Sequence, residues 1–387
     1  MKGRAAAIMK ISCGVLMTAF LPFSACGGDS SDTPPPPACS DTTINPPSSF
    51  DANSLSSSCF AGGATPQLDL DGPVANWTWN DPHVLKVGDE YWMYASATNY
   101  FDFPVRLYRL VSSDGISWSL NPATPVLADA APGSWDAGGL ETPAVVYFNC
   151  QYHLFYTGYQ YEVDTPEYQA NSPLDFRIGH AVSDDGITFT RTAQNPVVAP
   201  SGTSDSDPSN DWYAFIVGEP GPVVYNGEIY LYFTTVGADL EVMDSLQVIG
   251  LVRSSDGASW SAPELALKPD QSIYPRTADW VGYSTPNAIV IGGEMHLFFD
   301  VAHQPDGGSW LQLRLHHATS ADGRTGWTQD AAYIRKAGDF DWAVDEIRSP
   351  HALLDGDVLR LYFAGHYFNA VAPAWEHFAV GMMECGK

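Results

Sequence analysis

Apolar positions along the chain gather into short runs that pair across tight turns, and this arrangement recurs five times. Each copy begins close to a proline, continues through nearly unbroken apolar residues, turns at a Gly or Asn, and returns in an aromatic-rich segment. Such apolar runs are typical of strands buried on both faces, and turns such as Asn226-Gly227 favour hairpins because they need positive φ. The predicted hairpins are Asp81–Tyr94, Thr142–Tyr156, Glu219–Phe233, Thr285–Phe299 and Ser349–Phe363.

Two further markers divide the chain into similar units. An Asp-Gly turn with an aromatic residue after it follows four of the five hairpins, and a tryptophan stands five to eight residues before each proline. Each unit therefore holds four short strands, and the first and last prolines, Pro82 and Pro350, define a mean period of 67 residues. Repeated four-stranded units are the blades of a β-propeller. The sequence predicts an all-β fold, a five-bladed β-propeller with four-stranded antiparallel blades, over residues 66–387.

The fifth unit differs from the others because no Asp-Gly motif follows its hairpin. We expect His377–Met383 to form its last strand. A ring must close where the chain ends meet, and Pro66–Val74 is the segment predicted to supply the missing outer strand.

Four cysteines lie beyond the first 26 residues, an even number that suits an oxidising compartment. Three pairings are open among Cys39, Cys59, Cys150 and Cys385. A bond between Cys39 and Cys59 would lie in the segment before the propeller, whereas one between Cys150 and Cys385 would join a hairpin tip to the last strand.

The N-terminal residues are predicted to be a targeting segment outside the fold. A basic start precedes Ile11–Ala25, which is mostly apolar and short for a membrane span, and small residues lead into Cys26. This end resembles a bacterial lipobox, with Cys26 as the lipidated residue; an ordinary cleaved signal is the alternative. Residues 1–26 are then a lipoprotein signal peptide and residues 27–65 a disordered Pro- and Ser-rich tether. We expect an exported monomer, attached to the cell envelope (outer membrane or cell surface) through a lipid anchor only.

The net charge and the aromatic content indicate which classes of ligand the protein can bind. The formal net charge is −27, from 45 Asp and Glu against 18 Lys and Arg, which argues against nucleic acid because phosphate binding needs a basic surface. The chain contains 12 Trp and 19 Tyr. In an exported protein this content suits stacking on sugar rings, although a large β core also uses aromatic residues.

Three acidic residues stand beside the prolines that open consecutive inner strands, namely Asp81, Glu141 and Glu219. Inner strands of a propeller line a central channel, so these carboxylates are predicted to converge although they are distant in sequence. Glycoside hydrolysis needs one carboxyl group that protonates the leaving oxygen and a second that attacks or activates water. One acid near a proline is commonly a turn former, but three at equivalent places favour catalysis.

The pattern resembles the five-bladed propeller glycosidases, chiefly glycoside hydrolase families 43 and 32, with families 130 and 117 as relatives. Trp79-Asn80-Asp81-Pro82 is similar to the first-blade signature of those families, which implies that Asp81 is the base or nucleophile. Glu219 before Pro220 resembles the third-blade general acid. Glu141 occupies the second-blade place, where the families usually carry an Asp that tunes the acid.

In the third repeat the sequence reads Glu219-Pro220-Gly221-Pro222, so it does not decide which residue is equivalent to the single proline of the other repeats. Counting back from the Gly227 turn aligns Gly221 with the other prolines and places Glu219 like Glu141, two residues earlier. Counting from Trp212 aligns Pro220 instead and places Glu219 like Asp81. Adjacent strand residues face opposite ways. If Glu219 points away from the axis, Glu141 is the better candidate for the general acid.

Substrate contacts are expected from aromatic and charged residues near the strand entrances. The candidates are Trp79, Trp212, Tyr283, Glu346, Arg348 and His351. Arg348 is expected to pair with Glu346 or Asp345, or to grip a substrate hydroxyl. His351 and His83 could hold a calcium ion at the axis, although no cofactor is required.

The predicted activity is hydrolysis of a plant or algal type glycan that contains arabinose, xylose or fructose. The partner is then an oligosaccharide or polysaccharide. The alternatives are a non-catalytic glycan-binding lipoprotein and a glycoside phosphorylase like those of family 130. A propeller that binds only proteins is less well supported, because many loops are rich in Gly and Asp.

Overall fold

The structure of the protein is a computed structural model. It describes residues 59–61, 77–99, 102–161, 176–202, 212–237, 244–245, 247–275, 280–304, 311–356, 358–369 and 375–385. These residues form five antiparallel sheets, and no helix among them is long and apolar enough to cross a membrane. The predicted signal peptide, Cys26 and the segment Pro66–Val74 lie outside this part of the chain.

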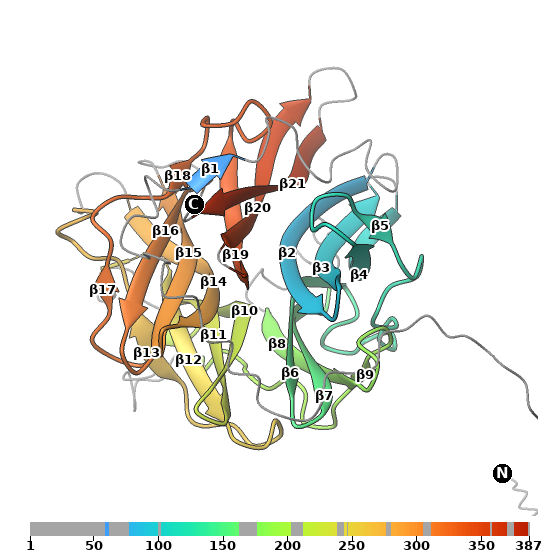
Figure 1. The fold of residues 1–387 in the computed structure, drawn as a ribbon. Helices are drawn as coiled ribbons and strands as arrows, with labels where there is room; N and C mark the ends of the chain where they lie inside the picture. The colour runs from blue at the N-terminus through green and yellow to red at the C-terminus, as the bar shows by residue number, and fades with distance from the viewer. Residues whose placement is uncertain are drawn as a thin grey trace, which may run out of the picture. The chain divides into compact units, whose positions relative to one another are not determined.

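The prediction of five four-stranded blades is confirmed (Figure 1). Blade 1 consists of β2 (Trp77–Val87), β3 (Glu90–Asn99), β4 (Asp102–Ser112) and β5 (Ser119–Leu120). Blade 2 consists of β6 (Gly139–Phe148), β7 (Gln151–Tyr159), β8 (Arg177–Ser183) and β9 (Thr190–Arg191). Blade 3 consists of β10 (Ile216–Tyr225), β11 (Glu228–Val236), β12 (Val248–Ser254) and β13 (Glu264–Leu267). Blade 4 consists of β14 (Trp280–Ile291), β15 (Glu294–Gln304), β16 (Leu311–Ser320) and β17 (Thr328–Gln329), and β18 (Arg335–Lys336) also pairs with β16. Blade 5 consists of β19 (Glu346–Asp355), β20 (Val358–Asn369), β21 (Trp375–Cys385) and β1 (Cys59–Ala61).

The blades form a closed ring around the inner strands β2, β6, β10, β14 and β19. Each inner strand contacts the next one, and β19 contacts β2. Five clusters of buried hydrophobic side chains fill the spaces between neighbouring blades. In one of them the rings of Tyr362 of blade 5 and Trp118 of blade 1 pack edge to face, with 6.1 Å between ring centroids. This packing on both faces of each sheet explains why the strands read as unbroken apolar runs.

The Asp-Gly motif is a self-capped turn that also joins the blades. In its first copy, one carboxylate oxygen of Asp114 accepts hydrogen bonds from the backbone N–H groups of Ile116 and Ser117, at 2.8 and 2.7 Å. The Gly115 carbonyl then accepts a hydrogen bond from the Tyr362 hydroxyl of the preceding blade at 3.0 Å. Tyrosines of blades 1 and 3 bond the glycine carbonyls of Asp-Gly turns in the blades that follow them around the ring in the same way, Tyr94 to Gly186 and Tyr232 to Gly323.

Ring closure differs from the prediction. The outer strand of blade 5 is β1, so the propeller includes Cys59–Ala61, which the sequence pattern placed in the tether. A disulfide bond joins Cys59 to Cys385, and Cys150 is also disulfide-bonded. The Cys59–Cys385 bond excludes the bonds Cys39–Cys59 and Cys150–Cys385 among the pairings that the sequence left open. Spacing alone could not choose, because Cys59 and Cys385 come together through the pairing of β1 with β21, two strands from opposite ends of the described chain.

Candidate active site

All five inner strands share one irregularity at the same repeat position. The residue before the proline has a left-handed backbone and starts a β-bulge, where the register with the second strand shifts. The five residues and their φ angles are Asp81 (54°), Thr142 (50°), Glu219 (52°), Thr285 (43°) and Ser349 (52°). For a residue other than glycine this conformation costs on the order of 1–3 kcal/mol, and such strain gathers at functional sites.

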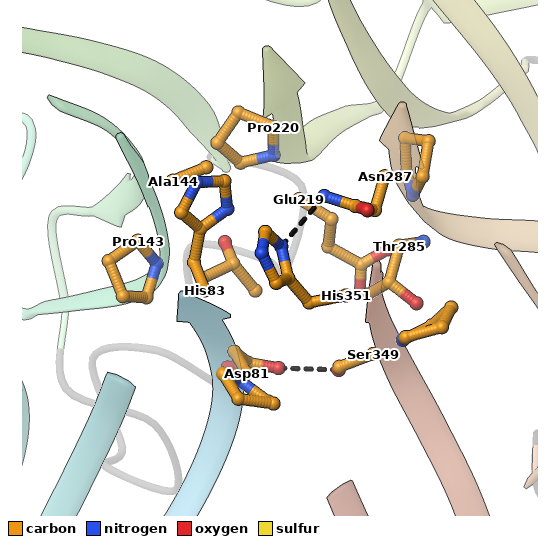
Figure 2. Close-up of a pocket in the computed structure, with 14 residues that line it drawn as sticks. Asp81, His83, Pro143, Ala144, Glu219, Pro220, Thr285, Asn287, Ser349 and His351 are labelled. Atoms are coloured by element: carbon orange, nitrogen blue, oxygen red, sulfur yellow. Dashed lines mark hydrogen bonds between the residues drawn. The ribbon is translucent and has the colours of Figure 1, made fainter. Parts of the chain in front are cut away.

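The β-bulge shows which residue of blade 3 is equivalent to Asp81. It also shows which residues line the central cavity of the propeller, here called the funnel. Glu219 is equivalent to Asp81, as the count from Trp212 predicted, and Glu141 lies one residue before its own equivalent, Thr142. An inserted residue breaks the alternation of a strand, so the left-handed residue, its proline and the next residue can all line the cavity. Residues from all five blades surround this open cavity, whose empty space, counted together with the part open to solvent, is about 310 Å³ (Figure 2).

Side chains of the second strands hold the left-handed residues in place. In four blades, such a side chain accepts the backbone N–H of the left-handed residue in the following blade. These bonds run from Thr142 to Ser96 (2.8 Å), Glu219 to Thr157 (2.7 Å), Thr285 to Thr234 (2.9 Å) and Ser349 to Asp300 (3.0 Å). The strained positions are therefore fixed by neighbouring blades, and the site depends on the closed ring.

Asp81 is buried at the funnel and is held by hydroxyl groups on both of its oxygens. Ser96 donates to Oδ2 at 2.8 Å, and Ser349 donates to Oδ1 at 2.7 Å. Both donors are fixed by the blades that carry them, so the carboxylate has one orientation. A carboxylate held in this way can act as a base toward water or as a nucleophile.

Glu219 lines the same cavity in a different environment. The backbone N–H of Thr285 donates to its Oε2 at 3.0 Å, and a guanidinium nitrogen of Arg348 lies 3.8 Å from Oε1. Burial and the nearby charge of Asp300 raise the pKa of Glu219 to about 7, against the opposing effect of Arg348. A carboxyl group that keeps its proton near neutral pH is suited to general acid catalysis.

Glu141 does not line the cavity, but it lies close enough to interact with both Asp81 and Arg348. The hydroxyl of Tyr159 donates to its Oε1 at 2.8 Å. Burial raises the pKa of Glu141, and the charge of Asp81 raises it further. The structure thus brings the three predicted carboxylates into one region, in which Asp81 and Glu219 line the cavity and Glu141 does not.

Sequence reasoning missed Asp300, a fully buried carboxylate on β15. Its oxygens accept hydrogen bonds from the hydroxyls of Ser284 and Thr285 and from the backbone N–H of Ser349. The available signal was an acidic residue at the end of the apolar run Met295–Phe299, where a charge needs partners.

Two histidines lie at the centre of the labelled residues in Figure 2, with their ring centroids 4.2 Å apart. The Nε2–H of His83 donates to the carbonyl of Val145 at 2.8 Å, and that of His351 donates to the carbonyl of Val84 at 2.8 Å. Asn287 donates to Nδ1 of His351 at 2.8 Å. Burial lowers the pKa of His83 to about 4 and lowers that of His351 as well, so both rings are neutral and tie adjacent blades together.

The described residues contain no group of three or more His, Cys, Asp or Glu side chains that could hold a metal ion. Calcium binding at His83 and His351 stays a prediction.

The other predicted contact residues fall into two groups. Trp79 and Tyr283 are fully buried within the blades, so neither ring has a face open to a sugar; this corrects their expected role. Trp212 is half-buried and packs against Tyr213 and Phe233, and its role stays a prediction.

The charged candidates Glu346 and Arg348 lie beside the site. Glu346 accepts the backbone N–H of Gln312 at 3.1 Å. Burial alone would lower the pKa of Arg348, but nearby carboxylates, Glu346 and Asp81 first among them, raise it. Arg348 is therefore a permanent cation among acidic groups.

Comparisons with known proteins place the fold. No family model matches the chain, and no curated protein matches its sequence. Solved structures that match include several glycoside hydrolases. The complex of BT0996 with RGII matches with a TM-score of 0.63 at 13% identity, over 85% of this chain and 93% of that one. A thermostable family-43 glycoside hydrolase matches with a TM-score of 0.54 at 15% identity, over 80% and 90% of the two chains. An α-L-arabinofuranosidase from Lactobacillus brevis matches with a TM-score of 0.56 at 11% identity, over 84% and 92%. The chain shares the fold of glycoside hydrolase propellers.

Proposed function

We propose that this chain is a glycoside hydrolase that uses Asp81 and Glu219 as its catalytic pair. The observation that carries the proposal is their equivalence: both occupy the left-handed position of an inner strand, in blades 1 and 3, and both line one funnel. Their surroundings differ, because two hydroxyls orient Asp81 while burial and Asp300 favour the protonated form of Glu219. Paired carboxyl groups with different environments are what glycoside hydrolysis requires.

The roles follow from these environments. Glu219 donates its proton to the glycosidic oxygen as the bond to the leaving sugar breaks. Asp81 attacks the anomeric carbon or removes a proton from the attacking water. Arg348, next to Glu219, stabilises the carboxylate that remains after proton donation. Glu141 lies within electrostatic reach of Asp81 and Arg348.

We propose a glycan containing arabinose, xylose or fructose as the substrate. One fold neighbour is an α-L-arabinofuranosidase, which supports arabinose within this range. The formal net charge of −27 and the carboxylates at the funnel favour an uncharged sugar over an acidic one.

The test is release of sugars from arabinan, xylan, fructan and algal polysaccharides, with Asp81→Asn and Glu219→Gln as inactive variants. Glu294→Gln is the control, because Glu294 is an exposed carboxylate at a hairpin turn remote from the funnel. We expect products from the wild type and the control, and a loss of at least about 10²-fold in both site variants. Full activity in either site variant would remove that residue from the mechanism.

Two other outcomes would replace the proposal. Binding of an oligosaccharide by calorimetry without any product after long incubation would indicate a glycan-capture protein. Products that form only when inorganic phosphate is present, as sugar phosphates, would indicate a phosphorylase.

We also propose export and lipid anchoring through Cys26, on the strength of the sequence alone. Globomycin should cause the precursor to accumulate, and Cys26→Ala should abolish incorporation of labelled palmitate. Unchanged processing under globomycin, together with no palmitate incorporation in the wild type, would indicate an ordinary cleaved signal.

A further inference from the structure

Asp300 connects the two sides of the proposed catalytic centre. Its carboxylate accepts the hydroxyl of Thr285, and one of its oxygens also accepts the backbone N–H of Ser349 at 3.0 Å. Thr285 and Ser349 are the left-handed residues of blades 4 and 5. One fully buried side chain thus fixes two of the five strained positions around the funnel.

Each of these two residues in turn contacts one catalytic carboxylate. The backbone N–H of Thr285 donates to Oε2 of Glu219 at 3.0 Å, and the hydroxyl of Ser349 donates to Oδ1 of Asp81 at 2.7 Å. The hydrogen-bonded chain therefore runs from Asp81 through Ser349, Asp300 and Thr285 to Glu219. It spans blades 1, 5, 4 and 3 and leaves out blade 2.

We propose that Asp300 is a positioning residue. It holds the carboxyl groups of Asp81 and Glu219 in the relative arrangement that catalysis needs, and it places a negative charge beside Glu219. This inference rests on the proposed glycoside hydrolase activity. The resemblance to known propeller glycosidases implies a tuning acid in blade 2, at Glu141, but the structure makes Thr142 the equivalent of Asp81 there and places Glu141 one residue earlier, outside the cavity lining. Here the charge comes from the second strand of blade 4.

Electrostatics at the site agree with this geometry. After burial, Asp300 is the largest influence that raises the pKa of Glu219, and burial raises the pKa of Asp300 as well. The cation that faces both groups is Arg348 on β19, which also interacts with Glu346 and Asp81. Two buried acids this strongly linked titrate as a pair, so removing one should make the other easier to ionise.

The first test measures the ionisation of Glu219 directly and needs no substrate. The protein is labelled with ¹³C at the Glu side-chain carboxyl, and the Glu219 signal is assigned by its absence in Glu219→Gln. In Asp300→Asn the titration midpoint of Glu219 should fall by at least about one pH unit, as expected when a neighbouring like charge is removed. An unchanged midpoint would overturn the inference.

The second test uses the glycan identified by the product screen. In Asp300→Asn the descending limb of the profile of kcat/KM against pH should move to lower pH, and kcat should fall at least about tenfold near pH 7 with little change in KM. Asp136→Asn is the matched control: Asp136 is also a buried carboxylate, but its partners are Arg191 and Tyr156, away from the funnel. In the control variant the pH at which kcat/KM declines should not change, even if the variant is less stable.

Thr285→Val covers the case in which Asp300→Asn does not fold. It removes only the hydroxyl that donates to Asp300 and keeps the backbone N–H that donates to Glu219. We expect a lower kcat with KM unchanged; wild-type kinetics in this variant would contradict the positioning role. If no glycan is cleaved at all, the proposed function fails, while the NMR titration still decides whether Asp300 controls the ionisation of Glu219.

Discussion

The hydroxyl of Ser349 donates a 2.7 Å hydrogen bond to Oδ1 of Asp81, although the two residues are 268 positions apart in the chain. Asp81 lies on the first inner strand and Ser349 on the last, so the bond crosses the seam where the ring closes. Orientation of the proposed base therefore depends on closure of the propeller. Loss of closure should disable the site before it unfolds the other blades.

Ser349→Ala should lower kcat/KM by about 10–100-fold, because a hydrogen bond to a charged group contributes about 1.5–3 kcal/mol. The measurement is steady-state kinetics on the glycan identified above. Ser349→Thr keeps the hydroxyl and should restore most of the activity. Equal activity in the alanine and wild-type proteins would show that the bond does not orient Asp81 for catalysis.

The activity should fall as the pH rises through about 7. Glu219 must be protonated to act as an acid, and burial together with Asp300 raises its pKa to about 7. Above that value kcat/KM should decline about tenfold per pH unit, since only the protonated form reacts. In Glu219→Gln an aryl glycoside with a very acidic leaving group should still react, without this limb. If the decline of activity above pH 7 persists in the variant, it must come from the ionisation of another group.

The fold should lose stability as the pH falls from about 6.5 toward about 3 because of paired buried histidines. His153 and His180 in blade 2 lie 2.9 Å apart between ring nitrogens, and burial lowers the pKa of His180 from 6.5 to about 3 and lowers that of His153. In blade 4, burial lowers the pKa of His296 to about 4 in a similar pair with His317. Because the unfolded chain binds protons in this range and the folded chain does not, stability is complete above about pH 6.5 and falls below it.

Blade 3 supplies the control for the histidine pairs. Tyr230 and Leu251 occupy the positions of His153 and His180, counted from the hairpin turn and from the Asp-Gly motif. His153→Tyr combined with His180→Leu should reduce the dependence of the unfolding free energy on pH, measured by urea denaturation, while the His296–His317 pair keeps its share. The same slope in both proteins would show that other groups cause the acid sensitivity.

Removing the Cys59–Cys385 disulfide should cost about 2–5 kcal/mol of unfolding free energy. The bond closes a chain segment of 326 residues and secures β1 against β21. The double variant Cys59→Ser/Cys385→Ser avoids a free thiol and leaves the disulfide of Cys150 in place. Denaturant unfolding measures the loss, and activity should fall with it if closure positions Asp81. Unchanged stability would mean that strand pairing alone closes the ring.

Much of the fold could be predicted because each blade repeats the same local chemistry. The residues at turns such as Asn226-Gly227 and the capped Asp114 turn specify hairpins through contacts a few positions apart. Apolar runs specify burial on both faces. The closing strand was misplaced because β1 is only three residues long and is defined by its partner β21, not by its own pattern.

By itself the sequence determined the number of blades, the order of the strands in blades 1 to 4 and the chemical character of the acids beside the prolines, since all of these follow from the repeated pattern of each blade. Only the tertiary structure decided which acids face the funnel, because a β-bulge interrupts the alternation that a linear reading assumes. It also decided that Asp300 stands between Asp81 and Glu219, a contact made through Ser349 and Thr285 from separate blades. Such contacts exist only once the five sheets enclose one axis, and no pattern along the chain records them.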